Sequence, residues 1–156
     1  YEIHSGDWNS DVCSSDLNPG EEPKPLVKVA SGGEVSRIML ALKTALAEAD
    51  KIPVLIFDEI DIGISGRIAQ AVGKSLTKLA QTHQVICITH LPQIASMSDN
   101  HFVVEKYTNE ERTFTKIRKL KPEEKPLEIA KLLGGEHVTE THIKSAEELI
   151  EQVKQI

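Results

Sequence analysis

Residues 54–59 read VLIFDE, and this stretch decides the fold. Four apolar residues without polar alternation are typical of a short strand in a parallel sheet that is covered on both faces. Pro53 directly precedes the run and is expected to stop the helix before it. Asp58 and Glu59 then stand at the carboxyl end of the strand, where open parallel sheets bind their ligands.

The sequence on either side of this strand predicts a βαβ unit. Upstream, apolar residues at three- and four-residue steps predict a helix of about four turns that opens at Ser31; they are Val35, Ile38, Met39, Leu42, Ala45, Leu46 and Ala49. Downstream, the same spacing predicts a second helix through Ile68, Ala69, Val72, Leu76 and Leu79. Residues 85–89, VICIT, repeat the buried-strand pattern and lead to His90. Parallel strands end at the same edge of a sheet, so Asp58, Glu59 and His90 are expected to lie along that edge.

The remaining sequence predicts a strand before the first helix and a hairpin with two helices after His90. Leu26 to Val29 form a strand candidate behind a proline-rich arm. A short helix follows His90, and then residues 102–107 and 113–118 predict a β-hairpin joined by the polar turn 108–112. A helix through residues 127–133 is expected to stop at Gly134-Gly135, and a last helix runs from about residue 140 to residue 155.

Composition excludes several classes of function. The 156 residues are 40% hydrophobic and 27% charged, which suits one globular domain with a single core. The formal net charge is −6, whereas a nucleic-acid surface is normally basic, so direct DNA binding by this segment is not favoured. The apolar runs are too short to span a bilayer, so we expect no membrane insertion. Two cysteines make no disulfide framework and fit a reducing cytosol, and Cys87 is expected to be a small core residue.

Residues 1–17, YEIHSGDWNSDVCSSDL, show no helical or strand period. From residue 6 to residue 17 they resemble the translation of a common sequencing-library adapter, apart from Asn9. We therefore expect this segment to be artefactual and exclude it, with Trp8 and Cys13, from functional reasoning. A natural disordered segment is the alternative. The functional part is then expected to be residues 18–156, with the protein continuing upstream of Asn18.

Ser31-Gly32-Gly33-Glu34 allows two interpretations. As a capping box, the Ser and Glu side chains would satisfy backbone N–H groups at the start of the helix. As a phosphate site, the two glycines would let a phosphate approach the backbone, where amides and the positive helix end attract its charge. The second interpretation suits the γ-phosphate of a nucleotide.

Asp58, Glu59 and His90 also allow a chemical and a structural interpretation. An Asp at a strand end is how many nucleotide hydrolases hold Mg²⁺, and Glu59 would then act as general base on the attacking water. The alternative is a strand end with solvated carboxylates. His90 follows a buried strand and could donate a hydrogen bond to the γ-phosphate, although a lone His is commonly a structural residue.

Four motifs together resemble the C-terminal half of an ABC-type, SMC-like ATPase head. They are SGGEVS at 31–36, VLIFDE at 54–59, Asp61 and ITH at 88–90. The longer segments around these motifs are similar to those of the RecN family in this group. The segments are VASGGEVSRIMLALK, FDEIDIGISGRIA and THLPQIA. The resemblance implies an α/β P-loop NTPase fold with ATP and Mg²⁺ as cofactors. It makes Ser31, Gly32, Gly33 and Glu34 the signature motif, Asp58 and Glu59 the Walker B pair, Asp61 the D-loop and His90 the switch histidine.

In that family the signature motif acts on ATP held by the opposing head, so the resemblance implies a homodimer through the heads. It also implies a role in DNA double-strand break repair and recombination, in the cytoplasm at the nucleoid. DNA would be bound by the intact protein rather than by this acidic segment.

The phosphate-binding loop G-x-x-x-x-G-K-[ST] does not occur in the sequence. Gly73-Lys74-Ser75 carries its last three letters, but Ile68 stands where the first Gly belongs, and we interpret the triplet as solvated helix surface. The Q-loop and the long coiled coil of the family are absent too. We therefore expect a C-terminal fragment of the head that is inactive alone.

Two other functions fit parts of the pattern. The nucleotide-binding subunit of an ABC transporter would have a membrane partner, but such subunits usually carry Pro after the Walker B Glu and a Ser-Ala-Leu-Asp D-loop, which Ile60 and Asp61 do not match. A non-catalytic interaction module with the ABC shape is the other alternative. Arg37 either lines the signature surface or solvates the helix, and the sequence does not decide between them.

Overall fold

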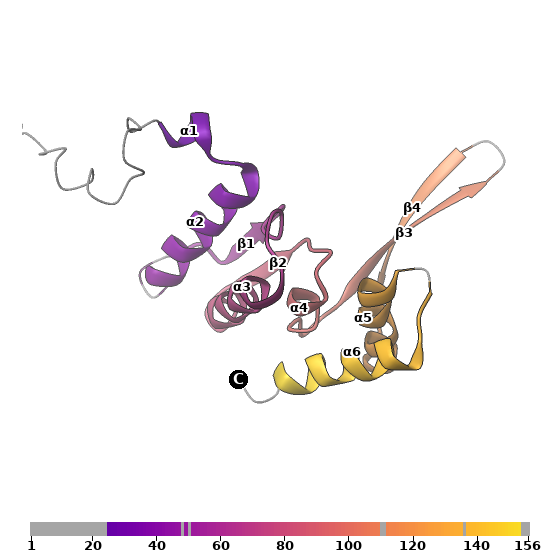
Figure 1. The fold of residues 1–156 in the computed structure, drawn as a ribbon. Helices are drawn as coiled ribbons and strands as arrows, with labels where there is room; N and C mark the ends of the chain where they lie inside the picture. Colours follow the sequence, from indigo (N-terminus) through magenta and orange to yellow (C-terminus); the bar gives the residue numbers. More distant parts are fainter. Residues whose placement is uncertain (1–24, 48, 50, 110–111, 136, 154–156) are drawn as a thin grey trace, which may run out of the picture. The chain divides into compact units, whose positions relative to one another are not determined.

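The computed structural model describes residues 25–153, apart from residues 48, 50, 110, 111 and 136 (Figure 1). Predictions about residues 1–17 lie outside this range. The chain divides into two units, Tyr1–Ser31 and Gly32–Ile156. Every helix among the described residues is too short or too polar to cross a membrane.

The described part of the first unit holds α1, Leu26–Val29, so the prediction of a strand here was wrong. The backbone bonds are local: the Lys28 N–H donates to the Pro25 carbonyl and the Ala30 N–H to the Leu26 carbonyl, both at 2.8 Å. A strand must pair its backbone groups with another strand. The described strands pair only with one another, and the segment satisfies its own groups in one helical turn instead.

The second unit begins with α2, Gly32–Ala45, which confirms the predicted helix start. The helix ends well before Pro53, because its last bond joins the Leu46 N–H to the Leu42 carbonyl and a turn to Ala49 follows. Leu40 is buried in the core, whereas the predicted apolar stripe is exposed; its exposed members include Val35, Ile38, Met39 and Leu42. The helix packs on α3 through its other side, so no described element covers the stripe.

The predicted βαβ unit is confirmed. It comprises β1, Val54–Phe57, α3, Gly66–Leu79, and β2, Gln84–Cys87. The two strands are parallel, with Val54 opposite Gln84 and Phe57 opposite Cys87. β2 ends earlier than expected, although the Ile88 N–H still donates to the Phe57 carbonyl at 3.0 Å.

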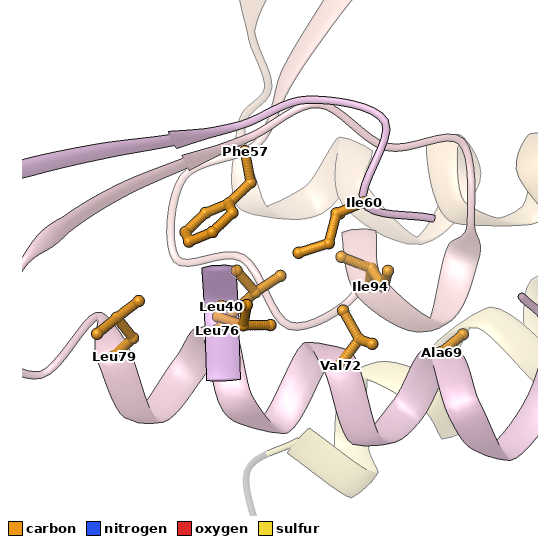
Figure 2. Packing of buried hydrophobic residues seen from close by; sticks show 8 residues of the cluster. All are labelled: Leu40, Phe57, Ile60, Ala69, Val72, Leu76, Leu79 and Ile94. Carbon is orange, nitrogen blue, oxygen red and sulfur yellow. The ribbon is translucent and has the colours of Figure 1, made fainter. Parts of the chain in front are cut away.

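One face of this sheet packs on the core and the other is exposed. Figure 2 shows the buried cluster, to which Phe57 contributes from β1 and Leu40 from α2; the others are Ile60, Ala69, Val72, Leu76, Leu79 and Ile94. Successive strand residues point to opposite faces, so Phe57 is 5% exposed and Ile56 is 67% exposed. The prediction that both faces are covered was therefore wrong for the described residues, since their helices cover only one.

Beyond the sheet, the predicted short helix, hairpin and two helices are all present. They are α4, Pro92–Ala95, the antiparallel pair β3, Phe102–Asn109, and β4, Arg112–Lys119, then α5, Lys125–Gly134, and α6, Glu140–Val153. Both hairpin strands are longer than expected. The 3₁₀ turn η2, Pro122–Glu124, leads into α5, which ends at Gly135 with a φ of 66°.

The two C-terminal helices pack on each other and on α4 around a second small core. Its buried residues are Ala95, Ile129, Ala130 and Ala146. Because Ala95 belongs to α4, the same short helix that carries Ile94 into the first core ties the second core to the sheet.

Candidate active site

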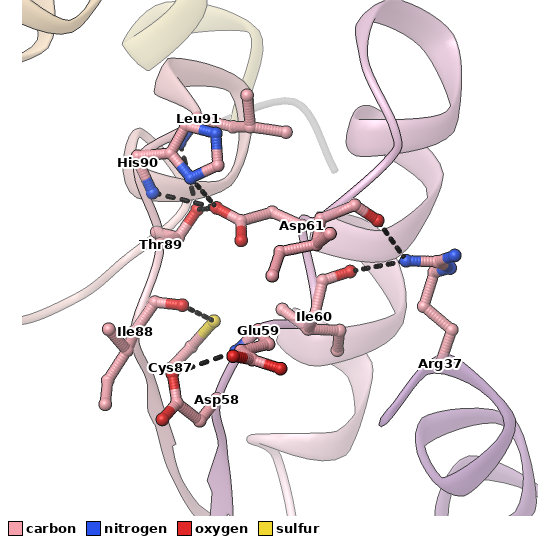
Figure 3. Close-up of polar contacts among 11 residues, drawn as sticks. Arg37, Asp58, Glu59, Ile60, Asp61, Cys87, Ile88, Thr89, His90 and Leu91 are labelled. Carbon is pink, nitrogen blue, oxygen red and sulfur yellow. Dashed lines mark hydrogen bonds and ion pairs between the residues drawn. The ribbon is translucent and has the colours of Figure 1, made fainter. Parts of the chain in front are cut away.

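The candidate site begins at the carboxyl end of β1, where Asp58 and Glu59 are both exposed. The Glu59 N–H donates to Asp58 Oδ1 at 2.9 Å, which holds the Asp58 side chain against the turn (Figure 3). Glu59 has a φ of 58° and is the one non-glycine residue in the described part of the chain with a positive φ. This conformation costs an ordinary residue about 1–2 kcal/mol, and such strain is concentrated at functional sites.

The first turn of α2 lies against this strained turn. A Cβ added at Gly33 would come within 2.8 Å of the Glu59 carbonyl and 3.1 Å of the Ile62 carbonyl, so only glycine permits the approach. A Cβ at Gly32 would come within 2.5 Å of Glu59 Oε2. The structure thus brings the two predicted signature glycines together with Glu59. Glu34 is exposed on the same first turn, and Ser31 directly precedes α2 but belongs to the first unit.

Two side chains of α2 that sequence reasoning did not assign hold the turn in place. Ser36 Oγ donates to the Asp58 carbonyl at 3.0 Å. Arg37 Nη1 donates to the carbonyl of Ile60 at 3.2 Å and to that of Ile62 at 2.8 Å. Figure 3 shows Arg37 reaching from α2 toward Ile60. Arg37 therefore does not simply solvate the helix: it lies beside the predicted signature glycine Gly33 and ties α2 to the segment after β1. Its acceptors are backbone carbonyls, which no side-chain pattern in the sequence reveals.

Asp61 joins the ends of the two parallel strands. Its side chain is 3% exposed, and Oδ2 accepts hydrogen bonds from Thr89 Oγ1 at 2.6 Å and from the His90 N–H at 2.8 Å. His90 Nδ1 lies 3.0 Å from the same oxygen, while the His90 side chain is 70% exposed. Asp58, Glu59 and His90 thus follow strand ends that are linked, as the sequence predicted for one sheet edge.

The electrostatics of Asp61 favour its charged form. Burial alone would raise the pKa of this carboxyl, but the bonds from Thr89 and from the His90 amide, with the charge of His90, together lower it below its ordinary value. An ionised Asp61 is a strong acceptor for all three donors.

Two other residues that the sequence singled out have structural roles. Cys87 packs against the core, as predicted, and burial, with the charges of Asp61 and Asp58, raises the pKa of its thiol to about 12. The Gly73-Lys74-Ser75 triplet lies within α3, as predicted. Gly73 is not solvated, however: it is buried, and an added Cβ would lie 2.6 Å from Met97 Sδ. Helix packing against Met97 explains that glycine.

Asp58 at this edge is a candidate ligand for a Mg²⁺ ion that also binds a nucleotide. The described residues contain no group of three or more His, Cys, Asp or Glu side chains placed to hold a metal ion. Mg²⁺ usually takes only one or two carboxylates and completes its shell with water and substrate phosphates. Exposed Asp58 at the end of β1 fits that mode, and the nearby N-terminus of α2 fits an anionic ligand.

Comparison with curated proteins finds DNA repair proteins among the relatives of this chain. No family model matches the chain. The DNA repair protein RecN of Haemophilus influenzae is 46% identical over 136 residues, which cover 87% of this chain and 24% of that protein. RecN of Halalkalibacterium halodurans is 48% identical over 134 residues, or 86% of this chain and 24% of that protein. RecN of Bacillus subtilis is 44% identical over 139 residues, which cover 89% of this chain and 24% of that protein.

The chain spans about a quarter of the length of these relatives. The alignments match 134 to 139 of the 156 residues of this chain, which is long enough to include the whole candidate site. At 44–48% identity over that length, the chain is similar to a segment of the RecN DNA repair proteins.

Proposed function

We propose that this chain supplies one face of an ATP-hydrolysing site in a RecN-type DNA repair protein. The observation that carries the proposal is the meeting of three motifs at one sheet edge. The turn after β1 carries Asp58 and Glu59, the glycines of α2 touch that turn, and Asp61 links it to His90. Each motif alone has a structural alternative, but their convergence on one edge favours a common ligand.

The chemistry assigns each side chain a role. Asp58 would be the protein ligand of Mg²⁺, which when bound neutralises charge on the phosphate oxygens. Glu59 would orient the attacking water and accept its proton, and exposed His90 would contact the γ-phosphate. These roles require a dry, shared site, because the carboxylates are exposed in the single chain.

The signature motif supplies the second half of the proposal. Ser31, Gly32, Gly33 and Glu34 would bind the phosphates of ATP held by an opposing copy, so that hydrolysis requires a homodimer through the heads. The sequence contains no phosphate-binding loop, so we propose that the chain by itself does not hydrolyse ATP. The work of the whole protein would be DNA repair and recombination in the bacterial cytoplasm, with DNA bound outside this acidic segment.

Substitution of Glu59 in a RecN-type protein that contains this segment tests the proposal. Glu59→Gln should lower ATP turnover by about 100-fold or more while ATP is still bound, because the amide cannot accept the proton of the water. The matched control is Glu147→Gln, since Glu147 is exposed on α6. Turnover that is unchanged by Glu59→Gln would reject the catalytic role and favour a non-catalytic module.

A further inference from the structure

We propose that Asp61 is a positioning residue for His90, fixing which ring nitrogen carries the proton and which one faces outward. The significance of the contact for catalysis rests on the proposed function. The contact itself is a property of this chain alone.

One oxygen atom of Asp61 faces three polar groups. Asp61 Oδ2 accepts from Thr89 Oγ1 at 2.6 Å and from the His90 N–H at 2.8 Å, and it lies 3.0 Å from His90 Nδ1. An ionised carboxylate has no proton to donate. A ring nitrogen at 3.0 Å from it must therefore carry the hydrogen, and His90 is assigned as protonated at Nδ1.

The contact between Asp61 and His90 is rigid. Asp61 is almost completely buried, so its side chain has little room to move. Thr89 Oγ1 donates to Asp61 and accepts the Leu91 N–H at 3.1 Å, which fixes the backbone on both sides of His90. The bonds span 28 and 29 positions in the sequence and join the turn after β1 to the end of β2.

The contact with Asp61 also decides which nitrogen of the His90 ring faces outward. With Nδ1 bound to Asp61, Nε2 is left as the atom of this mostly exposed side chain that can meet a ligand. Carboxylate–histidine pairs of this kind fix both the tautomer and the ring orientation. Asp61 thus acts on a phosphate through His90, because its own carboxylate is buried.

The tautomer of His90 can be measured without any nucleotide. Two-bond ¹H–¹⁵N spectra of the full chain, labelled on histidine and recorded near pH ~9 so that imidazoles are neutral, should show His90 with the proton on Nδ1. Asp61→Ala should transfer population to the Nε2–H form. Asp58→Ala is the matched control: it removes the same charge from the same turn without a bond to His90, and should leave the tautomer unchanged.

A wild-type spectrum with His90 protonated at Nε2 would overturn the proposal, and so would an Asp61→Ala spectrum identical to the wild type. If Asp61→Ala does not fold, the wild-type spectrum alone decides. In a RecN-type protein that contains this segment, Asp61→Ala should lower kcat by about 10–100-fold with little change in the KM for ATP. If His90 carries its proton on Nδ1 but Glu59→Gln does not change ATP turnover, the proposed function is rejected. The positioning of His90 by Asp61 is still supported in that case.

Discussion

Glu59 adopts a backbone conformation that its own side chain disfavours, with a φ of 58°. Glycine has no Cβ and tolerates this region, although it loses more chain entropy on folding. Glu59→Gly should therefore raise the free energy of unfolding by about 0.5–1 kcal/mol while removing the proposed base. Glu59→Ala keeps the Cβ and should give no such gain. Urea denaturation of the two variants measures the difference, and equal midpoints would show that the turn is not strained.

The position of the candidate site residues at strand ends could be predicted from the sequence, whereas the residues that hold the backbone of the turn could not. Asp58, Glu59 and His90 follow apolar strand runs, and that position is visible in the sequence. Ser36 and Arg37 donate hydrogen bonds to backbone carbonyls of the turn after β1. Every residue has a backbone carbonyl, so the residue types in the sequence do not reveal these acceptors. Their roles emerge only when α2 and that turn are brought together by packing.

At the scale of one strand, the two faces of β1 predict opposite responses to substitution. Phe57 is buried in the core and Phe57→Ala should cost about 3–5 kcal/mol of stability through the lost contacts and the cavity. Ile56, its neighbour, points to the open face, so Ile56→Thr keeps a strand-forming shape and should change stability by less than about 1 kcal/mol. Denaturation midpoints of both variants test this. A cost at Ile56 as large as that at Phe57 would mean that the open face is covered in solution.

The junction between β3 and α5 predicts a response to acid. Burial, reinforced by the charge of Lys125 and opposed by that of Glu128, lowers the pKa of His101. Its Nδ1 is buried and has no hydrogen-bond partner among the described residues. The unfolded chain then binds the proton more readily than the folded chain. Stability should fall as the pH drops below the ordinary histidine pKa of about 6.5, where only the unfolded His101 gains its proton.

His101→Asn removes this titration and should flatten the fall in stability between pH ~6.5 and pH ~5 relative to the wild type. Denaturant midpoints measured across that range give the comparison. Parallel curves for the two proteins would show that His101 is protonated as easily in the folded chain as in the unfolded one.

Elements with a long, one-sided pattern were predicted well, and the shortest element was predicted wrongly. α3 buries Ala69, Val72, Leu76 and Leu79 at the expected spacing, whereas Ile68 of the same predicted stripe is 58% exposed. Leu26–Val29 has strand-forming residues but no partner strand among the described residues, and local helical bonds prevail. For α2 the helix was right and the buried side was wrong, because periodicity marks an apolar stripe without saying what covers it.

At the scale of the whole molecule, charge decides what this segment can bind. The chain carries a formal net charge of −6, but four negative charges lie in the excluded residues 1–17. Residues 18–156 therefore have a formal net charge of −2, and only weak long-range repulsion opposes their approach to a DNA duplex. The β3–β4 hairpin is locally basic, with Lys106, Lys116 and Lys119 on its strands. Its Arg118, however, is paired with Glu105 at 3.6 Å and Glu124 at 2.8 Å. These few cations could neutralise only a few phosphates.

The chain alone should therefore bind duplex DNA more weakly than a Kd of about 10⁻⁴ M at physiological salt. Fluorescence anisotropy of a labelled duplex, titrated with the chain at several salt concentrations, measures both affinity and salt dependence. Any weak binding at low salt should disappear in Lys116→Glu, which reverses one hairpin charge. Micromolar binding with a steep salt dependence would instead place a DNA contact on this segment, because affinity of that kind requires many released counterions and hence many phosphate contacts.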